Sequence, residues 1–107
     1  KSNIINTPLV EGTHSQQFRS AISDSWLPAI ESHQPDLIFI SAGFDAHELD
    51  PLAQINLSKD DFTWITNEIV SLANAHCEGR IVSALEGGYH LEALAESAQC
   101  HIESLCE

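Results

Sequence analysis

The fold is decided by residues 35–51, which are Pro35-Asp36-Leu37-Ile38-Phe39-Ile40-Ser41-Ala42-Gly43-Phe44-Asp45-Ala46-His47-Glu48-Leu49-Asp50-Pro51. They begin with an apolar run, Leu37 to Ile40, that ends at small residues and Gly43, and such a run is typical of a strand buried on both faces. A polar loop follows. In open α/β sheets ligands bind beyond the carboxyl ends of parallel strands, so Asp45 lies where a metal-binding or substrate-binding carboxylate is expected.

A second buried strand is predicted at residues 80–85, and the loop Glu86-Gly87-Gly88-Tyr89 follows it. If the two strands are parallel neighbours or near neighbours, both loops open onto the same edge of the sheet, which brings a carboxylate and a phenol together. A carboxylate is a hard oxygen ligand for a divalent cation, and a phenol can donate a hydrogen bond to a developing oxyanion. The paired glycines permit a tight turn and the close approach of a ligand.

The helix predicted before the first strand spans about residues 15–32. Thr13 and Gln16 match a capping box at its start, and apolar residues recur every four positions along it. Pro28 lacks a backbone N–H and crowds the preceding turn, so we expect a kink or two shorter helices there.

Two further helices follow the first strand. One begins at a capping box of Ser58 and Asp61 and ends at Gly79. The other runs close to the C-terminus with a predicted apolar stripe of Leu91, Leu94, Ala95, Ala98, Ile102 and Leu105. The order helix, strand, helix, strand, helix indicates an α/β fold with parallel strands. Two central strands do not complete a sheet, so the chain is expected to be part of a larger α/β domain.

The composition excludes several classes of function. The 107 residues include 16 acidic and 4 basic side chains, and the net charge of −12 opposes binding to nucleic acid or anionic membranes. Neutral or cationic ligands are favoured. The three cysteines lack C-x-x-C spacing, which indicates reduced thiols rather than a disulfide framework, and no run is apolar enough to span a membrane. We therefore expect a cytoplasmic protein.

Two motifs resemble a known family. The segments 40–47 and 50–52, which read I-S-A-G-F-D-A-H and D-P-L, and the later segment 85–94, L-E-G-G-Y-H-L-E-A-L, are similar to the C-terminal part of the histone deacetylase family. The resemblance extends to Asn6-Thr7-Pro8-Leu9 and Gly12-Thr13 and so covers nearly the whole chain. It is strongest for class II-like members and the bacterial deacetylase and acetoin-utilisation group.

The resemblance implies specific roles. Asp45 corresponds to one of the two aspartates that hold the family's zinc, and Tyr89 to the tyrosine that polarises the acetyl carbonyl, while Gly87 and Gly88 line the substrate channel. The implied reaction is zinc-dependent hydrolysis of an acetyl group from an acetyl-lysine or acetyl-amine substrate. The implied fold is the arginase–deacetylase fold, with residues 1–107 as the C-terminal part of a deacetylase-like catalytic domain.

Other parts of the family pattern are missing from this chain. The D-x-H motif that supplies the second aspartate and the histidine ligand, and the histidine pair that supplies the general base, precede these motifs in the family and are not present. Asp45-Ala46-His47 spells D-x-H without the remaining context, so His47 is assigned only as an additional contact with metal or substrate. Catalytic zinc usually needs three protein ligands, so this chain alone is expected to be inactive and needs the missing part of the domain or self-association.

Several alternatives stay open from the residues. Taken alone, Asp45 is more often a capping aspartate, Tyr89 a packing residue and Asp50 a residue that shapes a turn before Pro51. The remaining histidines, His101 among them, are interpreted as ordinary surface residues. A ureohydrolase-like metalloenzyme piece is a second enzyme hypothesis, although His47 stands where that group has an aspartate. A third hypothesis is a non-catalytic binding module that retains half of a deacetylase fold.

Overall fold

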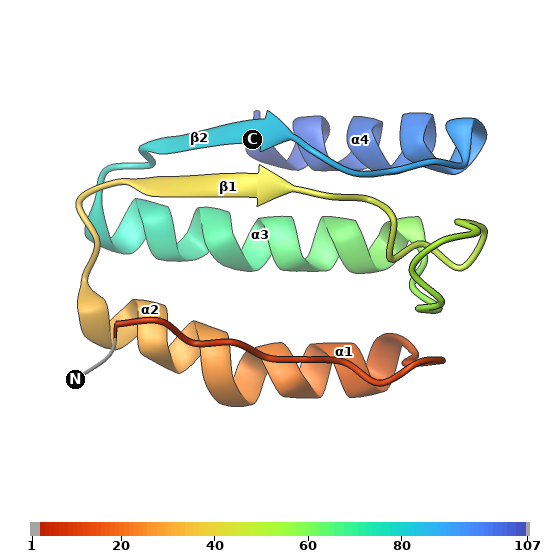
Figure 1. The fold of residues 1–107 in the computed structure, drawn as a ribbon. Coiled ribbons are helices and arrows are strands. Elements are labelled where there is room, and N and C mark those ends of the chain that lie inside the picture. The colour runs from red at the N-terminus through yellow and green to blue at the C-terminus, as the bar shows by residue number, and fades with distance from the viewer. Residues whose placement is uncertain (1–2, 107) are drawn as a thin grey trace.

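Two parallel strands form the sheet of the computed structural model, which describes residues 3–106 (Figure 1). In chain order the elements are α1 (Ser15–Ala21), η1 (Ile22–Trp26), α2 (Leu27–His33), β1 (Ile38–Ala42), α3 (Lys59–His76), β2 (Ile81–Leu85) and α4 (Leu91–Leu105). The predicted α/β class and the parallel pairing are confirmed, with Ile38 opposite Ile81 and Ala42 opposite Leu85. All helices of the described residues are too short or too polar to cross a membrane.

The helices leave one face of this sheet uncovered. Figure 1 shows α3 between the sheet and the α1–α2 layer, and α4 alongside α3. The side chains of Phe39 and Val82, which are paired across the two strands on that face, are 67% and 45% exposed. The prediction that the Leu37–Ile40 run is buried on both faces is therefore wrong within this chain. The described part of the chain supplies helices for only one face of the sheet.

The helical region before β1 is divided into three parts. Its first turn is closed by His14, whose backbone N–H donates to the Gln17 side chain at 2.9 Å, so the capping box lies one residue later than predicted. The predicted interruption takes the form of a π-helical turn, η1, immediately before Pro28. The wider turn accommodates a residue that has no N–H to donate.

The helix α3 begins and ends as predicted. The Ser58 backbone N–H donates to Asp61 Oδ2 at 3.0 Å, which is the capping interaction read from the sequence. After His76 the chain leaves the helix, and the Gly79 N–H donates back to the Ala73 carbonyl with Gly79 at a φ of 76°. The Ala73 carbonyl thus accepts from both Cys77 and Gly79, a return bond that is typical of a helix C-terminus closed by a residue with positive φ.

The helix α4 turns only part of its predicted apolar stripe inward, where Leu94 and Ala98 pack against the core. Its buried residues are Ala93, Ser97, His101 and Ser104, whereas Leu91 is 79% and Ile102 56% exposed. The interpretation of His101 as a surface residue is wrong. Its Nδ1 and Nε2 atoms lie 2.8 Å from the hydroxyls of Thr66 on α3 and Ser83 on β2. These hydrogen bonds, together with the close packing of the small buried residues of α4 against α3, determine which side of α4 faces the interior.

Candidate active site

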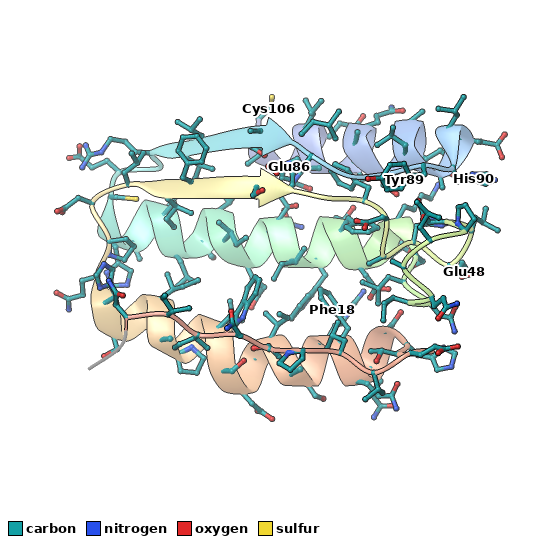
Figure 2. All side chains as sticks on the ribbon, viewed as in Figure 1. Phe18, Glu48, Glu86, Tyr89, His90 and Cys106 are labelled. Carbon is teal, nitrogen blue, oxygen red and sulfur yellow. The ribbon has the colours of Figure 1, made fainter. Side chains whose placement is uncertain are left out.

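The loops that follow β1 and β2 meet at the same edge of the sheet. Beyond the strands the ladder continues, because Glu86 N–H donates to the Ala42 carbonyl at 2.9 Å and Phe44 N–H donates to the Gly87 carbonyl at 2.8 Å. Figure 2 shows Glu86 at the ends of the strands, and Tyr89 and His90 beyond them. The predicted meeting of the two loops is confirmed.

Asp45 lies half-buried against the second loop. A Cβ atom added at Gly87 would come within 3.0 Å of Asp45 Oδ1, and one added at Gly43 would meet the same oxygen at 3.0 Å. Both glycines thus leave the space that this carboxylate fills. Among residues 3–106 no hydrogen bond or ion pair engages the Asp45 side chain. Its oxygens are therefore available to a ligand.

Tyr89 has a fixed main chain and an exposed side chain. Its backbone N–H donates to Asp50 Oδ2 at 2.7 Å, while the residue is 57% exposed. The preceding Gly88 has a φ of 140°, and a Cβ there would lie 2.8 Å from Leu94 Cδ1. Only glycine adopts this conformation readily, so the turn that presents the phenol depends on Gly88.

Asp50 is a member of the site that the sequence analysis missed. The interpretation as a turn residue is correct for Oδ1, which accepts from the Leu52 N–H at 2.9 Å. Oδ2 reaches the other loop at Tyr89. Burial would raise the pKa of Asp50, but the backbone N–H groups around the carboxylate outweigh this and lower the pKa below its usual value. No sequence pattern indicates a hydrogen bond between loops 39 residues apart.

His47 is buried within its own loop. Its Nδ1 atom accepts from the Leu49 N–H at 3.1 Å, and its main chain pairs with Leu57. The residue is only 7% exposed. Only Nε2 remains for the additional contact with metal or substrate that the sequence suggested.

The described residues fit only part of a metal site. Within residues 3–106 the Asp45 carboxylate has no hydrogen-bond partner, and two glycines leave the space that it fills, so it could serve as one oxygen ligand. In the described part of the chain, no three His, Cys, Asp or Glu side chains are grouped closely enough to hold a metal ion. One groove of this structure is lined by Trp26, Leu37 and Phe39, and its lining includes neither Asp45 nor Tyr89.

Comparisons with known proteins agree with this geometry. Residues 1–105 match the model of the histone deacetylase domain. The chain is 39% identical over 108 residues to Type-2 histone deacetylase 2 of Dictyostelium discoideum, covering 98% of this chain and 6% of that protein. It is 41% identical over 93 residues to Histone deacetylase 10, chloroplastic, of Oryza sativa subsp. japonica, covering 87% and 21%.

Solved structures share the fold. The acetylpolyamine aminohydrolase from Burkholderia pseudomallei matches with a TM-score of 0.82 and 28% identity, over 94% of this chain and 28% of that one. The arginase–deacetylase fold expected from the sequence is thereby confirmed. The chain spans less than a third of each of these three proteins.

Proposed function

The chain belongs to the histone deacetylase family, and from this premise we propose that residues 1–107 are the C-terminal part of a zinc-dependent deacetylase domain. The complete protein that contains them (the parent protein) would hydrolyse an acetyl group from an acetyl-lysine or acetyl-amine substrate. The observation that carries this proposal is the unpartnered Asp45 carboxylate, which lies against Gly87 at the same edge of the sheet as Tyr89.

Asp45 and Tyr89 have different roles in this proposal. Asp45 is one ligand of the zinc, and the remaining ligands come from residues outside this chain. When bound, zinc supplies Lewis-acid activation of the acyl carbonyl and of the attacking water. Tyr89 donates its phenolic hydrogen to the oxygen that becomes negative as the acetyl carbon turns tetrahedral. Gly87 and Gly88 allow the acyl group to approach the main chain closely.

The exposed face of the sheet supports the assignment to a larger domain. Parallel sheets are normally covered on both faces, yet Phe39 and Val82 on one face are exposed here. We propose that other parts of the parent domain cover this face and complete the zinc site. Expressed alone, residues 1–107 would bind no zinc tightly and would self-associate through the apolar surface. The cytoplasmic location stays part of this proposal, in keeping with the three free cysteines.

The charge of the chain bears on the substrate. A net charge of −12 favours cationic and neutral substrates over polyanions. The names of these relatives refer to histones and to acetylpolyamines. Histones and polyamines are both basic. An acetylated amine on an otherwise cationic carrier therefore fits the chain better than an acetylated nucleotide or acidic peptide.

The deciding experiment is acetate release by the parent protein loaded with zinc. We expect release from an acetyl-lysine peptide or an acetylpolyamine, and loss of that activity when a chelator removes the metal. Release of urea from a guanidino substrate would instead support the ureohydrolase alternative. Binding of acetylated peptide without turnover, in a parent protein that lacks the remaining ligands, would support the non-catalytic module.

A further inference from the structure

The two oxygens of the Asp50 carboxylate have different partners. Oδ1 accepts from the Leu52 N–H at 2.9 Å, which is the local contact that a turn requires. Oδ2 accepts from the Tyr89 N–H at 2.7 Å and so joins two loops that are 39 residues apart in the sequence. The local turn needs only the first of these bonds, so the second has a separate purpose.

The environment of Asp50 is unusual for a structural carboxylate. The residue is 7% exposed, and none of the ion pairs within residues 3–106 includes it. A buried charge without a cation must be stabilised by hydrogen bonds, and at Asp50 these come from the backbone of both loops. Charge-assisted bonds of this kind are stronger than neutral ones and hold their donors in place.

The main chain around Tyr89 is held on both sides. The Gly87 carbonyl accepts from Phe44 N–H, and the His90 carbonyl accepts from Leu94 N–H at 2.8 Å as α4 begins. Between these points the Tyr89 N–H is bound by Asp50. The phenol itself remains exposed and free to meet a substrate.

We propose that Asp50 is a positioning residue for Tyr89: its carboxylate fixes the main chain of the Gly-Gly-Tyr loop so that the phenol is presented to the reacting carbonyl. This role rests on the deacetylase function proposed above. Asp50 touches neither substrate nor metal and acts only through the Tyr89 backbone. A carboxylate is needed because Leu52 and Tyr89 donate to different oxygens, and the amide of an asparagine would present an NH₂ donor to one of these two N–H groups.

The test is a double-mutant cycle in the zinc-loaded parent protein with Asp50→Asn and Tyr89→Phe. The asparagine keeps one acceptor oxygen and loses the other, so we expect kcat to fall by about 10-fold to 100-fold with little change in KM. In the Tyr89→Phe background the same substitution should cost less than about twofold, because the group that it positions is already gone. Asp24→Asn, at an exposed aspartate of η1, is the matched control and should leave kcat unchanged.

A second readout follows the hydrogen bond itself. Exchange of the Tyr89 amide hydrogen should become on the order of tenfold faster in Asp50→Asn, while the Phe44 amide stays protected. Equal losses of kcat in both backgrounds, or unchanged exchange at Tyr89, would overturn the positioning role. A parent protein that is inactive before any substitution would overturn the deacetylase function as well, and that failure is recognised separately because no variant is involved.

Discussion

Two aspartates of this chain use their carboxylates in opposite ways. Asp61, at the start of α3, is fully buried and accepts hydrogen bonds from Ser15, Arg19 and Ser58. Asp45, at the end of β1, is half-buried and has no such partner among residues 3–106. Asp61 connects α1 to α3, whereas Asp45 Oδ1 lies against Gly43 and Gly87.

The difference separates structure from chemistry within one chain. Buried carboxylates in proteins normally have hydrogen-bond partners, so a buried carboxylate that has them can be explained by its contribution to the fold. A carboxylate that is kept without partners, in space reserved by glycines, needs another explanation. We expect substitutions at the edge of the sheet to change activity and those at the α1–α3 junction to change stability.

The largest effect is expected for Asp45→Ala in the parent protein. Removing one oxygen ligand should remove zinc and abolish deacetylation, because catalytic sites usually have three protein ligands. The thermal unfolding of the metal-free protein should change little, since no described hydrogen bond is lost. Metal analysis, turnover and calorimetry measure the three quantities. Full zinc occupancy in the variant would show that Asp45 is not a metal ligand, and the contrast with the structural Asp61 would no longer hold.

Tyr89→Phe should have the next largest effect. The phenol is exposed and only its hydroxyl is removed, so zinc content and stability should be retained. Turnover on an acetyl-lysine substrate should fall by about 100-fold to 1,000-fold, the usual loss for one oxyanion donor. Steady-state kinetics with metal analysis checks this. Near-parental turnover beside an inactive Asp45→Ala would favour a hydrolase that relies on the metal alone.

Asp61→Ala tests the other side of the comparison. It leaves the donors at Ser15, Arg19 and Ser58 without their acceptor, so we expect a loss of about 3 kcal/mol in the free energy of unfolding. This is the lower end of the range for a broken buried pair, because Arg19 is 38% exposed and can turn to solvent. Denaturant unfolding of the parent protein measures it. Asp60→Ala, at the exposed neighbour, is the control, and an equal loss there would show that only the negative charge at the helix N-terminus is involved.

The smallest effect is a pH dependence from His101. Burial lowers the pKa of His101 below its ordinary value of 6.5, so the folded protein favours the neutral ring. The unfolded chain then binds more protons as the pH falls below about 6.5, and stability should decrease by at most about 1.4 kcal/mol per pH unit. Stability from the lowered pKa values of Asp50 and Asp61 is lost only near and below 3.8. His101→Gln should flatten the pH dependence of the free energy of unfolding between pH 7 and 5, measured by denaturant titration. An unchanged pH dependence in this variant would show that other histidines cause it.

The features that the sequence predicted correctly are local or periodic. The Ser58 capping box, the break before Pro28 and the loops at the strand ends all depend on residues within a few positions of one another. The inward side of α4 was predicted only in part: the apolar stripe places Leu94 and Ala98 correctly, but it does not reveal that His101 finds hydroxyl partners on α3 and β2. Asp50 was overlooked for the same physical reason, since its second partner lies in another loop. Hydrogen bonds between distant segments leave no period in a sequence.

Gly88 limits how this chain can diverge. Every single-nucleotide change of a glycine codon that alters the amino acid introduces a Cβ atom, and at Gly88 that atom meets Leu94 in a backbone conformation with a φ of 140°. Gly12 also has a positive φ, of 84°, but a Cβ there would meet no atom within 4 Å. In a library of random variants selected for activity, position 12 should accept asparagine and position 88 should stay glycine. The conformation of this one turn should therefore restrict the Gly88 codon to synonymous changes.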